Sequence, residues 1–435
     1  MAERLTPELE AAAAEIASAE RGFHRPPSGL DAEGQAAVRR RALDLASGSG
    51  PLSAIGSYTL DGERASSQHC ENFIGAAQVP MGVAGPLLVS GSEIDGTVSV
   101  PMATTEGALL ASVNRGCRAI TAAGGATVFV EDVGMTRAPV FRTTGIDETR
   151  RLLEWLDANE ERIRAKAHKT SRYLELLGVR PSVVGSTVFL RFRFATGDAM
   201  GMNMVTIACD RVVSELIEPE TGVQCVALSG NYCVDKKPSA VNYQLGRGKR
   251  IHAEVVLDEL TVRKVLKSEA AALQDVAYRK NLLGSVAAGA LAFNAQFANV
   301  LAAVFVACGQ DVAHVVEGAM GVASFEARDN GSVYASVYMP DCPLAAIGGG
   351  TGLDTQREAL AVMGVRPDPE RPGAAVRRLA EIVGAVVLAG ELSLTAAFTS
   401  RDLARAHERL GRSSAASAAN AANAANAANA ANADD

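Results

Sequence analysis

The chain has 435 residues, a length that suits two or three domains and a large buried core. Hydrophobic residues make up 48% and charged residues 21%, which indicates a soluble globular protein and excludes an intrinsically disordered one. The net charge of −7 shows no nucleic-acid-binding footprint, and seven cysteines without a Cys-x-x-Cys pair argue against a zinc site or a disulfide framework and fit a reducing cytosol.

The first fifty residues are rich in Ala, Glu and Arg at helical spacing. This pattern predicts helices that are interrupted at Pro26-Pro27 and at SGSGP (47–51). The opening MAERLTPELE is charged and has no apolar core, so it does not read as a secretory signal. We expect residues 1–54 to form an N-terminal helical segment.

Short apolar runs mixed with Gly and Pro follow in ENFIGAAQVPMGVAGPLLVSG (71–91), and this mixture predicts strands and turns. The next segment, TEGALLASVNRGCRAITAA (105–123), has the spacing of a helix with small residues on one side.

Residues 139–226 have a pattern of their own. The stretch 149–169 predicts one amphipathic helix, 186–197 alternates like a strand, and 213–222 reads as the end of a helix. This succession predicts a small α+β insert, after which residues 254–320 return to long helices.

Residues 281–310 carry no charge and are long enough to span a bilayer. However, Asn294, Gln296 and Asn299 lie within this run, and unpaired amides are costly in lipid. We therefore predict a helix buried in protein, and no other segment reads as a candidate span. From Ser413 the chain is a low-complexity Ala-Ala-Asn repeat without an apolar stripe, which predicts disorder or a frayed helix.

The common nucleotide and hydrolase motifs are missing. Gly246-Arg247-Gly248 is followed by Ile251 where a dinucleotide fingerprint needs its third glycine, and there is no P-loop, GxSxG or HExxH. The run IGGGTG (347–352) has the backbone N–H groups to cradle a phosphate, but a simple turn is the commoner explanation of a lone glycine run.

Four segments place polar groups in apolar surroundings: Glu106, the Asp235-Lys236-Lys237 run, Asp311 and His407. Taken singly, each has an ordinary structural explanation, such as a helix cap, a solvated surface or an idle histidine. The octet GDAMGMNM (197–204) suits a loop against a flat ligand, although clustered methionines are more often core filler.

In combination these segments are far more specific. They resemble, in order, the signature blocks of 3-hydroxy-3-methylglutaryl-CoA (HMG-CoA) reductase over roughly residues 55–413, and Met202 resembles the class I branch of that family. The blocks that carry the resemblance are ENFIGAAQVPMGVAGPL (71–87), VPMATTEG (100–107), GDAMGMNM (197–204), SGNYCVDKKPSA (229–240), GQD (309–311), IGGGTG (347–352) and LAGELSLTAA (388–397).

The resemblance implies a four-electron reduction of HMG-CoA to mevalonate and CoA with NADPH, through mevaldyl-CoA and mevaldehyde, in the mevalonate pathway of isoprenoid biosynthesis. It implies that Glu106, Lys236, Asp311 and His407 are catalytic. Lys236 suits the oxyanion, and His407 suits protonation of the departing CoA thiolate. Glu106 suits proton donation to the aldehyde if burial keeps it protonated, with Asp311 between Lys236 and Glu106.

The resemblance also implies the ligand contacts, and no metal. Arg172 favours NADPH over NADH because a guanidinium forks a phosphate well. The implied NADPH-binding residues are Ser171, Arg172, Asp198, Met200, Gly201, Met202 and Asn203. The implied HMG-CoA-binding residues are Arg115, Arg118, Arg137, Ser229, Lys237, Lys280 and Asn299.

The implied fold is α+β. A large helical substrate domain (55–138 and 227–412) carries an inserted, ferredoxin-like antiparallel NADP-binding domain (139–226), and residues 413–435 form a disordered tail. Active sites between subunits imply a homodimer or homotetramer. The membrane anchor of eukaryotic relatives is missing, so we expect a cytoplasmic protein. Gln296 replaces a histidine of some relatives, and Ser413 resembles an animal phosphosite.

Three alternatives remain open at this point. A different CoA-thioester enzyme, such as a lyase or thiolase, needs no nicotinamide, and a loss of reduced-cofactor absorbance separates it from a reductase. A non-catalytic CoA- or lipid-binding scaffold is disfavoured because all four catalytic positions are filled. A membrane-embedded protein is a third alternative, which detergent-free solubility would exclude.

Overall fold

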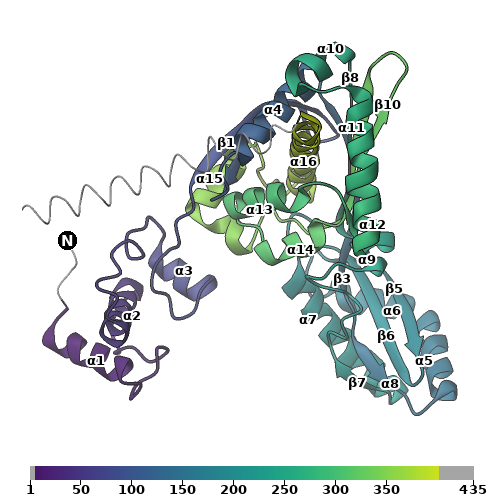
Figure 1. Cartoon of the computed structure of the whole chain (residues 1–435). Coiled ribbons are helices and arrows are strands. Elements are labelled where there is room, and N and C mark those ends of the chain that lie inside the picture. Colours follow the sequence, from purple (N-terminus) through teal and green to yellow (C-terminus); the bar gives the residue numbers. More distant parts are fainter. Residues whose placement is uncertain (1–4, 401–435) are drawn as a thin grey trace, which may run out of the picture.

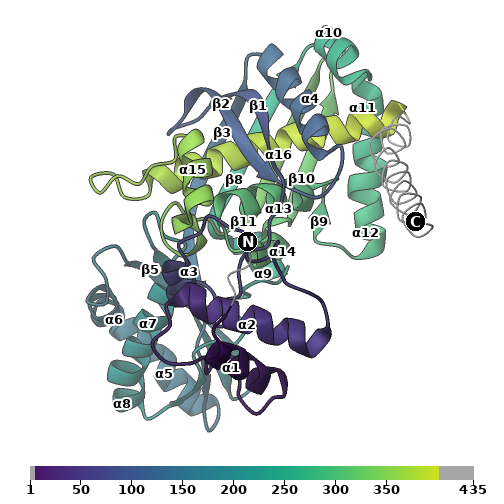
Figure 2. The same ribbon diagram turned by 90° about the vertical axis from the view of Figure 1, so that its left-hand side faces the viewer.

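The structure, a computed structural model, describes residues 5–400 and arranges them in three parts (Figures 1 and 2). A small helical module at the N-terminus is followed by a large body with a broad sheet and by a smaller α+β body that joins one end of it. His407, Ser413 and the predicted tail lie outside the described residues.

The N-terminal module consists of three helices whose first turns are capped by the side chains of Thr6, Asp31 and Asp61. Tyr58, Ala65 and Phe73 pack with Ala36 of the second helix. Residues 55–73 therefore belong to this module, past the boundary expected at residue 54. The helices are α1 (Pro7–Ala17), α2 (Ala32–Ser47) and α3 (Gly62–Gln68).

The large body is built on a mixed sheet with the strand order β2–β1–β3–β8–β11–β10–β9. The pairs β1–β3 and β10–β9 are parallel, and the other neighbours are antiparallel. The strands are β1 (Met81–Ser90), β2 (Asp95–Ala103), β3 (Ala126–Arg137), β8 (Arg247–Leu257), β9 (Ala292–Phe293), β10 (Gly321–Ala327) and β11 (Val333–Cys342).

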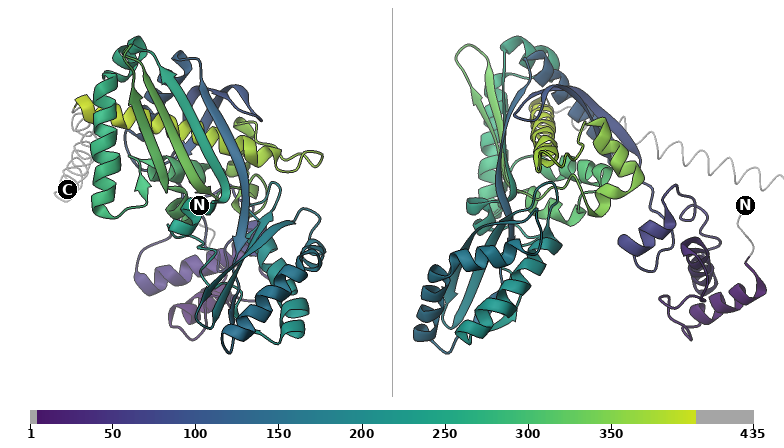
Figure 3. Two further views of the ribbon diagram at one scale, coloured as in Figure 1. Left: turned by 90° about the vertical axis from the view of Figure 1, so that its right-hand side faces the viewer. Right: turned by 180° about the vertical axis from the view of Figure 1, so that it is seen from behind.

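Burial alternates along the central strands, so that in β8 Ile251, Ala253 and Val255 are buried while Glu254 and Val256 are exposed. The buried face carries α16, which crosses β3, β8 and β11, and the other face is largely open (Figure 3, left). The large domain expected to be helical therefore has its helices packed around a broad sheet that organises its core.

The helices of the large body surround this core. They are α4 (Leu109–Ala122), α9 (Ala240–Leu245), α10 (Glu259–Thr261), α11 (Ala270–Val276), α12 (Ser285–Ala288), α13 (Phe297–Cys308), α14 (Val315–Gly318), α15 (Asp354–Val362) and α16 (Ala374–Ser400). Shorter π-helical or 3₁₀ turns are η2 (Val262–Leu266), η3 (Ala277–Gly284), η4 (Val312–His314) and η5 (Gly349–Gly352).

The uncharged run 281–310 is not one helix, contrary to the prediction. α12 ends at Gly289, which has φ 68°, and α13 begins only at Phe297. The buried Glu391 carboxylate of α16 accepts the backbone N–H groups of Ala295 and Gln296, and this fixes the break before α13.

A different helix has the length and composition of a membrane span, contrary to the expectation that no other segment would. Within residues 5–400 this is Ala374–Thr399 of α16, and 83% of its most apolar window is buried inside the fold. A helix that is apolar all round suits the interior of a large domain.

The small body follows β3 and has the order β–α–β–β–α–β, with the antiparallel strands arranged as β7–β4–β6–β5. The predicted helix 149–169 is split at Asn159, whose side chain donates to the Trp155 carbonyl, whereas the helix end predicted in 213–222 is confirmed at Thr221. Its elements are β4 (Val140–Arg142), α5 (Ile146–Ala158), α6 (Glu160–His168), β5 (Glu175–Val184), β6 (Thr187–Ala195), α7 (Met202–Val212), η1 (Val213–Ile217), α8 (Glu218–Thr221) and β7 (Gln224–Ala227).

A second hydrophobic core fills the small body. It runs from Met135 to Val223 and contains Phe141, Phe192 and Phe194. The long strand β3 passes from the large sheet into this body, where its last residues pair with β6 (Figure 3, left). The junction of the two bodies is therefore held by a continuous strand.

Candidate active site

Lys236 and Asp311, which the resemblance places next to each other, form an ion pair. Lys236 lies in the loop between β7 and α9, Asp311 lies between α13 and η4, and their side chains approach to 2.8 Å (Nζ to Oδ2). The hydrogen bond that Lys236 donates to Asp311 raises the pKa of Lys236. Partial burial works against ionisation of Asp311, but the Lys236 bond outweighs it and the pKa of Asp311 is lowered. Both groups are therefore held in their charged forms, and the lysine side chain is 41% exposed.

Glu106 follows β2 on the surface, where Asn299 donates to its carboxylate at 3.4 Å. Its backbone N–H donates to Thr104 Oγ1 at 3.0 Å. The burial expected to keep Glu106 protonated is absent from this single chain, because the residue is exposed. Within residues 5–400, no hydrogen bond or ion pair joins Glu106 to Lys236 or Asp311.

The loop that carries Lys236 has a strained backbone. Asn231, Val234 and Lys236 all have positive φ values, of 61°, 52° and 58°. Such conformations cost about 1–3 kcal/mol each for residues other than glycine and persist only where the surroundings hold them. Two contacts hold this loop: Asn242 donates to the Val234 carbonyl at 3.1 Å, and the Lys236 N–H donates to Glu317 at 3.2 Å.

Behind the loop lies a buried charge cluster that the sequence analysis missed. The fully buried guanidinium of Arg247, at the start of β8, forms 2.8 Å ion pairs with both Asp235 and Glu317. It also donates to Thr136 at the end of β3 and to the sulfur of Met202 at the start of α7. One side chain thus joins the large body, the small body and the lysine loop.

The cluster changes the protonation of its members. Burial opposes ionisation of Asp235, but the His314 bond and the Arg247 charge outweigh it and hold the pKa of Asp235 well below its usual range. Burial and the neighbouring Glu317 carboxylate raise the pKa of Asp341, which accepts a 2.8 Å bond from Asn242. No local motif signals this cluster, because its members are distant in the sequence.

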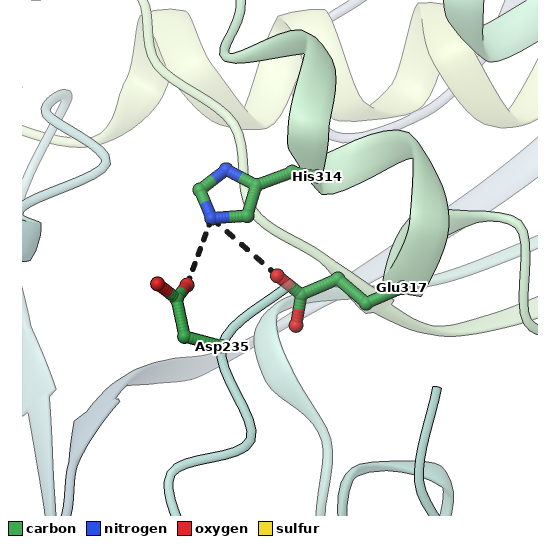
Figure 4. A group of neighbouring side chains, drawn as sticks. All are labelled: Asp235, His314 and Glu317. Carbon is green, nitrogen blue, oxygen red and sulfur yellow. Dashed lines mark hydrogen bonds and ion pairs between the residues drawn. The ribbon is translucent and has the colours of Figure 1, made fainter. Parts of the chain in front are cut away.

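Asp235, His314 and Glu317 have atoms close enough together to hold a metal ion (Figure 4). His314 Nε2 lies 3.0 Å from Asp235 Oδ1 and 3.4 Å from Glu317 Oε1. However, Arg247 donates to these same two oxygens. Since a guanidinium already neutralises the carboxylates and would repel a divalent cation, the geometry is that of an ion-pair cluster.

The GDAMGMNM octet connects the two bodies. Met200, Met202 and Met204 pack against the core of the small body, so part of the octet is core filler. The Asp198 carboxylate accepts the backbone N–H of Val376 in the first turn of α16 at 3.0 Å, and its carbonyl accepts the N–H of Ala346 at 2.8 Å. Asp198 therefore has a structural role in this chain.

The glycine run lies beside the octet, because Ala199 and Ile347 form a parallel bridge. Gly348 and Gly349 are exposed, have positive φ values, and would have open space around an added Cβ atom. In the part of the chain that the structure describes, no side chain caps the first turn of α7. Exposed glycine amides beside an uncapped helix N-terminus form a suitable cradle for a phosphate group.

The residues expected to bind phosphate groups differ in exposure: Arg172 and Arg118 are exposed, whereas Arg115 is half-buried. Arg172 is exposed in the loop before β5, where its guanidinium lies over the Tyr173 ring and donates to its hydroxyl. Ser171 accepts the Tyr173 N–H. Arg118 is exposed on α4, but Arg115 is half-buried and bonds to the Ser393 hydroxyl and carbonyl. Arg115 therefore also ties α4 to α16.

The remaining expected substrate contacts lie on several elements. Arg137 ends β3 with a buried Nε for which residues 5–400 provide no hydrogen-bond partner, and Ser229 Oγ lies 3.7 Å from Cys233 Sγ. Lys237 donates to the Asp235 carbonyl, while Lys280 lies over the Phe398 ring. Burial lowers the pKa of Lys280. Gln296 donates to the Gly390 carbonyl of α16, which accounts for its burial.

Comparisons with known proteins identify the family to which the chain is similar. The profile of the family described as hydroxymethylglutaryl-coenzyme A reductase matches residues 35–412. The chain is 51% identical to the 3-hydroxy-3-methylglutaryl-coenzyme A reductase of Methanothermobacter thermautotrophicus, over 86% of this chain and 93% of that one. The enzyme of that name from Halobacterium salinarum is 50% identical, over 87% and 93%.

Solved structures agree on the fold. The class II 3-hydroxy-3-methylglutaryl-CoA reductase of Streptococcus pneumoniae, solved with NADPH in open conformations, aligns with a TM-score of 0.60 over 76% of this chain and 87% of that one. Its sequence identity is 18%, so this likeness concerns the mixed α/β fold alone. On the strength of the profile match and the sequence relatives, the chain belongs to the hydroxymethylglutaryl-coenzyme A reductase family.

Proposed function

We propose that the protein is an oxidoreductase that reduces 3-hydroxy-3-methylglutaryl-CoA to mevalonate and CoA at the expense of NADPH. The reaction passes through mevaldyl-CoA and mevaldehyde and serves isoprenoid synthesis. The observation that carries the proposal is the exposed Lys236–Asp311 pair on a strained loop, in a chain half identical to reductases of that name.

The residues of the octet and its surroundings fit NADPH. The uncapped start of α7 and the exposed Gly348 and Gly349 suit its pyrophosphate. Arg172 and Ser171 suit its 2′-phosphate, and Met200, Met202 and Asn203 suit its ring and ribose. When bound, NADPH supplies the hydride for each reduction. Gly201 is required by packing as well, because an added Cβ would lie 2.3 Å from Thr196 Cγ2.

Lys236 stabilises the negative charge that develops on the carbonyl oxygen of the substrate. A fixed ammonium does this without reorganising at the moment of reaction. Asp311 holds Lys236 charged and oriented through the 2.8 Å ion pair, since the bond raises the pKa of Lys236. In this proposal Lys236 stabilises charge and does not donate a proton.

Glu106 and His407 supply protons in this proposal. Asn299 orients the Glu106 carboxylate, and His407 protonates the leaving CoA thiolate. Because Glu106 is exposed in the single chain, its role as an acid requires a cover, which a second subunit would provide. Arg137, whose buried Nε has no hydrogen-bond partner within residues 5–400, and Ser229, Lys237 and Lys280 suit the acid and hydroxyl groups of the substrate.

We further propose a homodimer or homotetramer with active sites between subunits. The open face of the large sheet supports an interface, because Phe129 is 63% exposed and Val256 43% exposed there. Arg118 then suits the CoA phosphates, whereas Arg115 would have to leave Ser393 to do so.

Three finer assignments complete the proposal. The small body is the inserted, ferredoxin-like NADP-binding domain at about 139–226, and residues up to about 412 complete the substrate domain. The enzyme is class I-like: Met202 supports this, as does 43% identity to a Panax ginseng enzyme against 18% to the class II structure. The protein is cytoplasmic, in keeping with the burial of its one apolar span-length helix among residues 5–400.

The test is a spectrophotometric assay of purified protein with HMG-CoA, run with NADPH and with NADH. Oxidation of NADPH, with two cofactors consumed per mevalonate formed, is the expected result. A preference for NADH would keep the reaction and remove the assignment of Arg172. No oxidation of either cofactor by folded protein would reject the proposed function in favour of another CoA chemistry.

A further inference from the structure

His314 lies buried behind the Lys236–Asp311 pair. It ends η4, three residues after Asp311, and only 1% of its side chain is exposed. Its Nε2 faces the carboxylates of Asp235 and Glu317 (Figure 4). Its Nδ1 lies 3.8 Å from Asp311 Oδ2. The ring thus lies between the residue that precedes Lys236 and the residue that pairs with it.

The contact with Asp235 has a defined direction. Asp235 is held ionised by its surroundings, so its oxygen accepts and His314 Nε2 donates at 3.0 Å. Arg247 donates to the same Asp235 oxygen from the side of the small body. Asp235 is therefore fixed by two donors, and it fixes in turn the strained backbone at Lys236.

Glu317 completes the support. It lies one helical turn after His314, is fully buried, and accepts both the Arg247 guanidinium and the backbone N–H of Lys236. Its carboxylate also lies 3.4 Å from His314 Nε2. The segment from Asp311 to Glu317 therefore touches Lys236 twice, at the ammonium through Asp311 and at the backbone through Glu317, with His314 between the two contacts.

We propose that His314 is a positioning residue that sets the Lys236 ammonium relative to Asp311, acting through its hydrogen bond to Asp235. This inference rests on the proposed function, because it assumes that Lys236 acts on the substrate. A mutation far from the reacting atoms that displaces a catalytic group by about 1 Å can lower the rate about 10²-fold. Loss of the Asp235 bond is therefore expected to lower kcat while leaving the binding of NADPH unchanged.

A matched pair of variants tests the bond. His314→Gln keeps an N–H donor at about the same reach, and His314→Met has the same length without a donor. Arg247 still pairs with Asp235 and Glu317 in both variants, so no buried carboxylate loses its counter-charge. We expect His314→Met to lower kcat about tenfold or more with KM for NADPH unchanged, and His314→Gln to retain most of the activity.

The outcomes separate this inference from the proposed function. A wild-type protein without HMG-CoA-dependent NADPH oxidation rejects both. An active wild type, an inactive Lys236→Ala variant and a His314→Met variant with wild-type kcat overturn the positioning role alone. Equal losses of kcat in the Gln and Met variants also overturn it, because the hydrogen bond to Asp235 then makes no difference to the rate. If the Met variant does not fold, His314→Asn replaces it: its shorter amide cannot reach Asp235, so a retained kcat overturns the inference and a lowered one supports it.

Discussion

Two ion pairs of equal length lie beside Lys236, and they differ in how deeply they are buried. Lys236 itself forms the first pair, and its backbone N–H donates to Glu317 of the second. The Lys236–Asp311 pair is 2.8 Å long with side chains 41% and 34% exposed, and the Arg247–Glu317 pair is 2.8 Å long with both side chains fully buried. An exposed pair contributes little to stability and remains accessible to a ligand. A buried pair cannot lose one partner without leaving an uncompensated charge. Burial, and not ion-pair length, therefore separates the pair that we propose to act on the substrate from the pair that supports it.

The largest effect is expected from removing the buried guanidinium. Arg247→Met leaves Glu317 and Asp235 without a cation and should lower the free energy of unfolding by about 3–5 kcal/mol. The measurement is urea denaturation followed by circular dichroism. The matched control is Arg263→Met, whose exposed partner is Glu259, with an expected loss below about 1 kcal/mol. Equal losses in the two variants would show that burial does not distinguish these pairs.

The exposed pair should respond in the opposite way. Lys236→Ala should lower kcat by about 10²–10³-fold, as removal of an oxyanion donor does, while the melting temperature stays close to that of the wild type. Steady-state kinetics with HMG-CoA and thermal melting measure the two effects. Lys264→Ala, at another exposed lysine, serves as the control for activity. A Lys236→Ala enzyme with normal kcat would remove the lysine from the reaction.

Glu391 offers a third case, a buried carboxyl held by backbone amides. Burial raises its pKa to about 7, although the N–H groups of Ala295 and Gln296 oppose the shift. The native carboxyl then binds its proton more tightly than the unfolded one, so native stability is lost as the pH rises from about 4.5 to about 7.

Glu391→Gln should abolish that part of the pH dependence. The free energy of unfolding of the wild type, relative to the variant, should fall on the order of 3 kcal/mol between those pH values, since each pKa unit corresponds to about 1.4 kcal/mol. Denaturation curves at a series of pH values give this difference. A difference that is constant with pH would mean that the pKa of Glu391 is the same in the native and the unfolded state.

The sequence predicts these regions unequally, for physical reasons. The Lys236–Asp311 pair lies in compact motifs, so the resemblance names both residues, and the structure brings them together. The Arg247 cluster draws its members from β3, β8, α14 and the lysine loop, and nothing local marks them as neighbours. Tertiary pairing of distant charges is visible only after the fold is known.

The same difference explains the errors in secondary structure. In the small body, amphipathic spacing predicts the helix at 149–169 apart from the break at Asn159, and alternation predicts β6, but β4, β5, α7 and β7 are not predicted individually. Composition alone made 281–310 a single helix, because the break depends on Glu391, which lies far along the chain and caps it from α16. Glu106 was expected to be buried because its neighbours are apolar, but it lies beyond the end of β2 on the surface.

The smallest effect concerns Asp198, where the ligand role and the structural role are both open to measurement. Its carboxylate accepts the Val376 N–H in the first turn of α16, and loss of such a cap costs about 1 kcal/mol. Asp198→Ala should therefore lower the free energy of unfolding by about that amount, and Asp198→Asn, which keeps an acceptor, by less. If KM for NADPH rises in the Asn variant while stability is retained, the charge of Asp198 also serves the cofactor. If KM rises only in the Ala variant, together with the loss of stability, Asp198 affects NADPH binding indirectly. Its hydrogen bond to the Val376 N–H would then hold the octet loop in position against the start of α16.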